Sequence, residues 1–183
     1  MKKAATLCTC YFFLLTACHQ PFNAAAEYTR QSTMFIQAIT RPAGDNRILV
    51  DKPFDLSYFV CLSDLLKDTA NFTKEELVLI EKQAKHPPVA RWTNALVPGT
   101  RIISSDTVTA AFNNLSNGWP YVYKHIGHVL YAYSAPVFIR NYTYCLFYAH
   151  FTCGGLCGEG HLALYKKEGN TWKEIKTYCD WIS

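Results

Sequence analysis

The sequence is poor in charged residues, which make up only 17% of its 183 residues and leave a formal net charge of +4. Its lysines and arginines form no block or stripe. This argues against nucleic acid as a partner, because duplex-binding domains cluster such residues. No apolar run reaches the length of about 20 residues that a membrane-crossing helix needs. With 50% hydrophobic and 15% aromatic residues, the chain is too apolar to remain disordered. We therefore expect a compact domain.

The first eighteen residues predict attachment to a membrane through a lipid. Two lysines precede a short apolar run, and that run ends in the sequence Leu15-Thr16-Ala17-Cys18. This order is typical of a bacterial lipoprotein signal, which is removed before a cysteine that then carries acyl chains such as palmitate. We expect removal of residues 1–17 and lipidation of Cys18. The protein would then lie in the bacterial cell envelope, facing the periplasm or on the surface.

An ordinary secretory signal, cut near Ala24-Ala25-Ala26, is the alternative to a lipoprotein signal. In either case the segment after the signal is polar and alanine-rich and lacks periodicity. Residues 18–32 are therefore interpreted as the lipidated cysteine and a flexible tether. Residues 33–183 suffice for a single domain with a real core.

Helices are predicted mainly in the middle of the chain. The clearest spans residues 73–85, because Thr73-Lys74-Glu75-Glu76 has the form of a capping box and His86-Pro87-Pro88 cannot continue a helix. Ser105 is expected to cap a second helix over residues 106–115, and Pro120 suits the first turn of a third that ends at Gly127. A helix over residues 54–66 has only weak support.

Segments rich in aromatic and β-branched residues, separated by turn residues, predict a sheet in the last third of the chain. These segments are residues 129–133, 136–139, 142–153, 160–167 and 171–178. Shorter strands are expected at residues 33–40, 47–51 and 101–104. The longest strand should be central, with Cys145 and Phe147 on one face and Leu146 and Tyr148 on the other. The predicted fold class is α+β, with N-terminal helices packed on a C-terminal antiparallel β-meander.

Five cysteines remain after removal of the signal and lipidation of Cys18. They are Cys61, Cys145, Cys153, Cys157 and Cys179. An oxidising envelope favours disulfides, and an odd number leaves at least one thiol free, which we expect to be buried. The closest pair, Cys153 and Cys157, lies in a glycine-rich loop between two predicted strands. We predict a short disulfide between them, and no metal site or cofactor.

Two other interpretations of this loop stay open. Zinc would use both loop cysteines with His150 or His161, although structural zinc sites usually show a second spaced pair. A thiol-dependent or hydrolytic enzyme would use Cys153 or Cys157 as nucleophile, activated by one of these histidines. Glu159 is interpreted as a solvated loop residue. We assign no catalytic residue.

An aromatic cleft is a further possibility, and it would make the protein a binder of small ligands. Its candidate residues are Trp119, Tyr121, Tyr123, Tyr131 and Tyr133. Aromatic stripes are more often part of a core. We therefore predict first a non-enzymatic envelope protein whose surface binds another envelope component, such as a protein.

From residue 73 to the end, the chain resembles a group of small uncharacterised bacterial lipoproteins and secreted proteins. The motifs that carry the resemblance are an aromatic helical segment with Trp119, the strand Ser134-Ala135-Pro136-Val137-Phe138, the loop from Cys153 to Gly160, and a closing hairpin. This hairpin contains Trp172-Lys173 and ends in Trp181-Ile182-Ser183. The resemblance implies a common fold. It implies no activity, substrate or catalytic residue.

Overall fold

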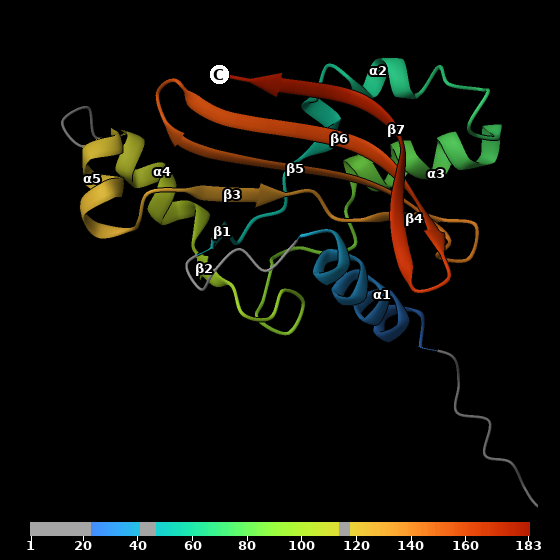
Figure 1. The fold of residues 1–183 in the computed structure, drawn as a ribbon, viewed down its shortest axis with the longest axis horizontal. Coiled ribbons are helices and arrows are strands. Elements are labelled where there is room, and N and C mark those ends of the chain that lie inside the picture. The colour runs from blue at the N-terminus through green and yellow to red at the C-terminus, as the bar shows by residue number, and fades with distance from the viewer. Residues whose placement is uncertain (1–22, 41–46, 114–117) are drawn as a thin grey trace, which may run out of the picture.

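The computed structural model describes residues 23–40, 47–113 and 118–183, and it has the predicted α+β architecture with one mixed sheet of seven strands (Figure 1). The helices are α1 (Ala24–Ile39), the 3-10 helix η1 (Leu56–Tyr58), α2 (Leu62–Leu65), α3 (Lys74–Lys85), α4 (Ser105–Asn113) and α5 (Gly118–His125). The strands are β1 (Ile48–Val50), β2 (Arg101–Ile103), β3 (Leu130–Tyr133), β4 (Val137–Ile139), β5 (Tyr144–Gly154), β6 (Cys157–Glu168) and β7 (Thr171–Ile182). No helix among the described residues has the length and apolar character to cross a bilayer.

The sheet follows the order β2-β1-β3-β5-β6-β7, with β4 paired to the first part of β5. Strands β5, β6 and β7 form the expected antiparallel meander. The short strand β1, by contrast, pairs in parallel with both β2 and β3. The sheet is therefore mixed, and its parallel part joins residues from the first third of the chain to the meander.

The two faces of β5 bury different side chains, as the alternation of the sequence predicted. Cys145 and Phe147 pack with Phe35 of α1 on one face. Leu146 and Tyr148 pack on the other face, in the cluster that includes residues of η1, α2 and α3. With both faces covered, β5 lies at the centre of the core.

The first helix corrects two expectations from the sequence. Residues 33–40 were expected to form a strand, but α1 runs from Ala24 to Ile39, and the Asn23 side chain accepts hydrogen bonds from the backbone N–H groups of its first turn. The expected tether through residue 32 is therefore helical from Ala24 onward. β-branched residues suggested a strand, but Phe35 and Ile36 are fully buried against the sheet, and this tertiary packing outweighs the weak local preference.

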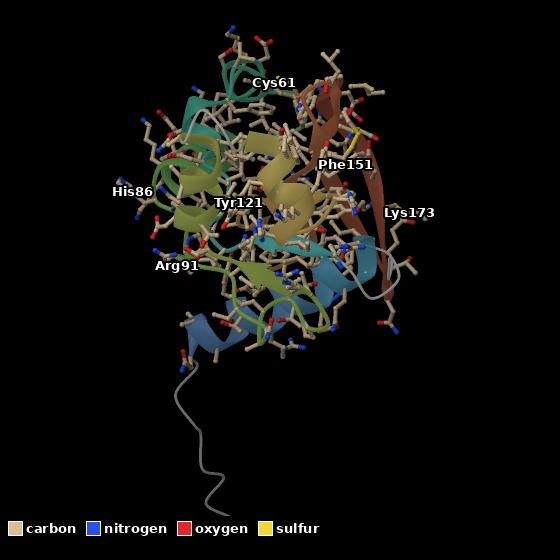
Figure 2. All side chains as sticks on the ribbon, turned by 90° about the vertical axis from the view of Figure 1, so that its left-hand side faces the viewer. Cys61, His86, Arg91, Tyr121, Phe151 and Lys173 are labelled. Carbon is tan, nitrogen blue, oxygen red and sulfur yellow. A yellow bond between two sulfur atoms is a disulfide. The ribbon has the colours of Figure 1, made fainter. Side chains whose placement is uncertain are left out.

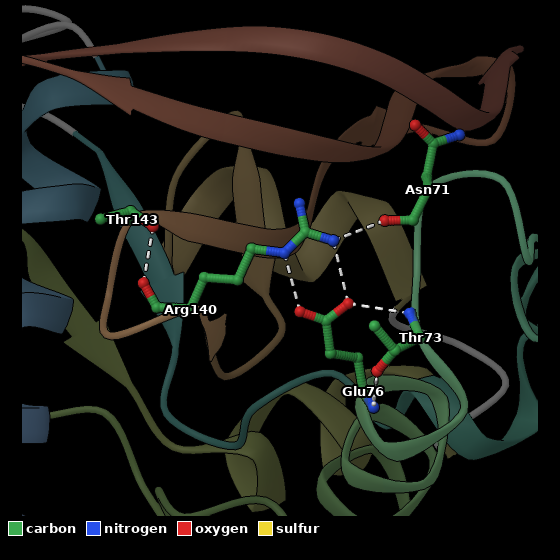
Figure 3. A network of polar contacts seen from close by, with 5 residues as sticks. All are labelled: Asn71, Thr73, Glu76, Arg140 and Thr143. Atoms are coloured by element: carbon green, nitrogen blue, oxygen red, sulfur yellow. Dashed lines mark hydrogen bonds and ion pairs between the residues drawn. The ribbon is translucent and has the colours of Figure 1, made fainter.

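The predicted capping box at α3 is present and has an additional partner (Figure 3). The carboxylate of Glu76 accepts a hydrogen bond from the backbone N–H of Thr73, and the Thr73 hydroxyl accepts one from the N–H of Glu76. The same carboxylate binds the guanidinium of Arg140 through two contacts of 2.8 and 2.9 Å. Arg140 also donates to the carbonyl of Asn71. The start of α3 is thereby tied to the turn between β4 and β5.

That turn has an uncommon backbone. Arg140, Asn141 and Tyr142 have φ values of 51°, 52° and 62°, in the left-handed region that non-glycine residues rarely adopt. The ion pair with Glu76 and the contact of the Tyr142 ring with Phe138, at a centroid separation of 5.2 Å, hold the turn in this conformation. Local strain is thus offset by tertiary contacts.

The remaining helices differ from the predictions in detail. The weakly predicted helix over residues 54–66 consists of η1 and α2, separated by residues 59–61. Helix α4 begins at Ser105 itself, and the hydroxyl of Ser104 accepts the N–H of Asp106. The end predicted for this helix, residue 115, lies outside the described residues.

The glycine-rich segment is a tight hairpin and not the long loop that the sequence suggested. Strand β5 continues to Gly154 and β6 begins at Cys157, so only two residues form the turn. Gly158 and Gly160 lie within β6, where a Cβ atom at Gly160 would come within 2.0 Å of the Trp181 indole nitrogen. These two glycines therefore provide room for an aromatic ring and do not mark a loop.

Four of the cysteines that the structure describes pair in two bridges. Cys153 and Cys157, which were predicted to bridge, face each other across the hairpin with Cα atoms 5.0 Å apart. A second bridge joins Cys61 to Cys179, at a Cα separation of 5.9 Å and 118 residues apart in sequence. Cys145 is free and fully buried, which agrees with the expectation of a buried thiol.

Candidate functional site

An open pocket of about 230 Å³ lies on the α1 side of the sheet, beyond the C-terminal end of that helix. We refer to it as the β3–β6 pocket. Its lining includes Arg47, Tyr131, Ala149, Phe151, Glu159 and His161. These side chains come from the start of β1 and from three neighbouring strands. Only the folded sheet brings them together.

The floor of the pocket is apolar because cross-strand neighbours on one face of the sheet are apolar. Tyr131 of β3 lies opposite Phe151 of β5, and Tyr133 lies opposite Ala149. The rings of Tyr131 and Phe151 are 5.9 Å apart between centroids. Both rings remain partly accessible, whereas Tyr133 is almost completely buried beneath them. The pocket thus presents two aromatic surfaces to solvent.

Arg47 forms one wall of the pocket, beside this apolar floor. It precedes β1 by one residue, and the parallel pairing of Leu49 with Tyr131 places Arg47 on the face that carries the pocket. The guanidinium carbon lies 5.3 Å from the centroid of the Tyr131 ring, and Nη1 donates to the Tyr133 hydroxyl at 3.2 Å. Arg47 therefore places a guanidinium group at this wall of the pocket.

Glu159 lies on the other side of the floor, opposite Phe151 on β6. The sequence suggested a solvated loop residue. Glu159 is indeed exposed, but it belongs to a strand, and its side chain lines the pocket. The pocket therefore has a carboxylate acceptor on β6 and a guanidinium donor beside β1, with aromatic rings between them.

His161 lies next to Glu159 on the same face and is held by two carboxylates of β7. Its Nδ1 contacts Asp180, its cross-strand neighbour, and its Nε2 contacts Glu174 at 2.8 Å. The Thr177 hydroxyl donates to the other oxygen of Glu174 at 2.6 Å. Both ring nitrogens are engaged, so the ring orientation is fixed at the edge of the pocket.

The protonated form of His161 is favoured. Partial burial by itself lowers the pKa of the imidazole, but the hydrogen bonds and charges of Asp180 and Glu174 outweigh it and raise the pKa above its usual value. Even when the ring is protonated, the two carboxylates give this edge a net negative charge. An imidazole with both nitrogens occupied has no lone pair with which to act as a general base.

His150 pairs with Gly160 and is among the residues that line the pocket, but its side chain lies on the opposite face of the sheet from His161. Its ring contacts those of Phe54, Tyr148 and Trp181, at centroid separations between 5.3 and 6.1 Å. Burial in this aromatic environment lowers the pKa of His150. The two histidines considered as partners of the loop cysteines are therefore separated by the sheet.

In this structure the loop cysteines are not available as the nucleophile of a thiol-dependent enzyme or as ligands of a zinc ion. Cys153 and Cys157 are bridged, so neither offers a thiolate as nucleophile or as zinc ligand. The one thiol described, that of Cys145, is fully buried, and burial raises its pKa. Among the residues that the structure describes, no three His, Cys, Asp or Glu side chains are arranged to hold a metal ion.

The predicted aromatic cleft is divided between two places. Tyr131 and Tyr133 contribute to the β3–β6 pocket, but Trp119, Tyr121 and Tyr123 belong to α5. Figure 2 shows Tyr121 on this helix, well apart from Phe151. Trp119 and Tyr123 stack on each other, and the Tyr123 hydroxyl donates to the carbonyl of Cys153. These aromatic residues of α5 therefore stabilise the end of the sheet.

Sequence reasoning overlooked Arg47, Glu174 and Asp180 as site residues. Arg47 lies far from the pocket in sequence, and no local pattern links it to Tyr131. The carboxylates carried a weak signal, because they lie on the strand that follows His161 in a predicted hairpin. That signal was insufficient, since the register of this hairpin changes along its length.

Comparison with models of known protein families, with curated protein sequences and with solved structures gives no match to this chain. The resemblance noted from the sequence motifs stays a prediction. The functional interpretation therefore depends on the geometry of the pocket alone.

Proposed function

We propose that this protein is a lipid-anchored component of the bacterial envelope and that it binds one ring of a hydroxylated ligand, a saccharide, in the β3–β6 pocket. The observation that carries the proposal is the arrangement of the pocket. Partly accessible aromatic rings form its floor, a guanidinium group lies at one wall and a carboxylate acceptor lies at the other.

The size of the pocket limits the ligand. Its volume of about 230 Å³ is below the range of about 300 to 1,000 Å³ that is usual for drug-sized ligands. The open pocket therefore suits one ring of a longer molecule, whose remainder extends into solvent. A glycan of the envelope has this form. The proposal thus keeps the sequence-based hypothesis of an envelope component as partner and favours a sugar over a protein.

The chemistry of the walls favours hydroxyl groups. Arg47 only donates hydrogen bonds and an ionised Glu159 only accepts them, whereas a hydroxyl group does both. A strongly anionic ligand would meet the negative edge formed by Glu159, Asp180 and Glu174. The apolar face of a sugar ring packs well on Tyr131 and Phe151.

The proposal of an anchor at Cys18 is supported by where α1 begins. Ala24-Ala25-Ala26, the alternative cleavage region, forms the first turn of this helix, and Asn23 caps it. A cut there would remove the cap and the first turn, and loss of a cap typically costs about 1 kcal/mol. A cut before Cys18 leaves the helix complete.

The purified mature protein is titrated with a panel of neutral and N-acetylated monosaccharides, and binding is measured by calorimetry or NMR. We expect at least one of these sugars to bind the protein. Glu159→Gln should weaken it about tenfold or more, because a hydrogen bond to a charged group contributes about 1.5 to 3 kcal/mol and about 1.4 kcal/mol is a factor of ten. Phe151→Ala should weaken it further.

Two matched controls separate the pocket from general effects. Glu168→Gln removes a carboxylate at the far end of β6, and Phe112→Ala removes a partly exposed ring on α4. Both variants should bind the sugar like the parent protein. The proposal fails if no sugar of the panel binds, or if Glu159→Gln and Phe151→Ala bind as tightly as their controls.

A further inference from the structure

We infer that the anchored domain rests on the bilayer through the end that carries the N-terminus of α1 and the turn between β6 and β7, with the β3–β6 pocket held away from the lipid. We call this the anchor-side end. The inference rests on the proposed lipidation of Cys18. It adds an interaction surface, with an anionic lipid headgroup layer as its partner.

The first argument is the length of chain between the lipid and the fold. Helix α1 begins at Ala24, six residues after Cys18. Even a fully extended chain spans at most about 3.6 Å per residue, so Ala24 lies within roughly 22 Å of the lipidated residue. A tether that continued to residue 32 would reach more than twice as far. The structure therefore keeps the start of α1 close to the membrane.

The second argument is that the β6–β7 turn lies beside the start of α1. Hydrogen bonds within α1 lower the pKa of Glu27 in its first turn, and the positive charge of Lys167, just before the β6–β7 turn, lies close enough to help lower the pKa of that carboxyl. Trp172, near the beginning of β7, packs its ring against Phe35 in the C-terminal half of α1, at a centroid separation of 4.9 Å, so the hairpin lies along the helix. An orientation of the domain that places Ala24 near the bilayer therefore also places this turn near the bilayer.

The third argument is charge. The turn region carries Lys166, Lys167 and Lys173 but only one acid, Glu168, so it has an excess of two positive charges. Figure 2 shows Lys173 at the outer edge of the sheet. Lysine and arginine side chains near an anionic membrane surface are attracted to it. Within α1 itself, Glu27 and Arg30 neutralise each other.

The pocket lies at the opposite end of α1. Thr40, which follows the last helical residue, lines it, and the 16 residues of the helix span about 24 Å. The acidic groups Glu159 and Asp180 are found at this end. An anionic bilayer would repel them, so charge and tether length favour the same orientation. The pocket then opens toward a glycan layer and away from the membrane.

Energy transfer to the bilayer tests the orientation. The mature lipoprotein is reconstituted into vesicles that contain anionic phospholipid and a lipid with a dansyl headgroup, which accepts energy from tryptophan. Trp172 marks the anchor-side end, and Trp119 on α5 marks a distant end of the sheet. We expect Trp172→Phe to lower the transfer by more than the matched variant Trp119→Phe does, because Trp92 and Trp181 contribute equally in both variants. Near-ultraviolet circular dichroism checks that both variants are folded.

The possible failures are distinguishable. Flotation of the vesicles reports anchoring, so protein that stays at the bottom of the gradient would refute lipidation of Cys18 and with it this inference. If the protein floats but both variants lose transfer equally, or Trp119→Phe loses more, the proposed orientation is wrong, whereas lipidation of Cys18 is still supported.

A longer tether provides a second test. Lengthening the chain before Ala24 by twelve Gly and Ser residues should reduce energy transfer from Trp172, and unchanged transfer would overturn the argument from tether length. Sugar binding is measured separately and does not depend on these results.

Discussion

The indole of Trp181 crosses the backbone of the neighbouring strand at Gly160 and donates its N–H to the hydroxyl of Tyr148, 2.9 Å away on β5. One side chain of β7 thereby reaches across β6 to the central strand. The contact requires glycine at position 160, because a Cβ atom there would overlap the indole. It explains why the glycine-rich segment continues into a strand.

Gly160→Ala should therefore destabilise the protein substantially. Forcing extra atoms into a well-packed site typically costs about 1 to 3 kcal/mol. We expect the midpoint of urea denaturation to fall accordingly. Gly155→Ala is the matched control, because a Cβ atom at Gly155 would meet nothing within 4 Å. Equal stability of the two variants would show that the indole moves aside without cost.

The two disulfides should differ in their effect on the free energy of unfolding. Closing a chain segment of 118 residues removes far more unfolded-state entropy than closing one of four. Chain-entropy arguments give about 5 kcal/mol for the Cys61–Cys179 bridge and about 2 kcal/mol for the Cys153–Cys157 bridge. Double alanine variants of each pair, compared by thermal and denaturant unfolding, test this order. A larger loss for the Cys153–Cys157 pair would contradict it.

His161 should make stability depend on pH in a defined direction. Its folded-state pKa lies above the value of about 6.5 expected in the unfolded chain, so protonation favours the folded state. This contribution is complete below about pH 6.5 and is lost as the pH rises through the raised folded-state pKa. Denaturation midpoints measured between pH 5 and 9 should show the loss, and His161→Gln should abolish it.

His150 serves as an internal contrast to His161. Burial lowers its pKa, so its contribution has the opposite sign, and stability decreases when the pH falls below about 6.5. The His161→Gln protein should therefore retain the decrease at acidic pH. If the His161→Gln protein loses as much stability toward alkaline pH as the parent protein, the contacts of His161 with Asp180 and Glu174 do not cause the effect.

The ion pair between Arg140 and Glu76 should be coupled more strongly than an ordinary surface pair. It is bidentate, and the Glu76 side chain is only 15% exposed. In a double-mutant cycle with alanine we expect a coupling of about 1 kcal/mol, because partial solvent exposure limits the energy of the pair. The exposed helical pair of Glu81 and Lys85 is the control, with an expected coupling of about 0.3 to 0.5 kcal/mol. Equal coupling in both cycles would contradict the prediction.

Local sequence patterns determined those elements whose signals lie within a few residues. Thr73 and Glu76 predict the start of α3, because the capping box needs only the first turn of the helix. The turn at Gly169 and Asn170 predicts the hairpin of β6 and β7, and alternation along β5 predicts its two buried faces. The tendency of residues 33–40 was misjudged, since helix and strand propensities differ little there and burial against the sheet decides between them.

The candidate site was decided by tertiary structure. Near the turn, Lys166 lies opposite Lys173, and this register would place Tyr178 opposite His161. Two irregularities in the pairing of β6 and β7 shift the register, so Asp180 takes that place. Arg47 reaches the pocket only because β1 pairs in parallel with β3. The sequence by itself thus determined helix starts, turns and the alternation of faces. Strand register and the pairing of distant segments depend on the packing of the whole core, which no local pattern encodes.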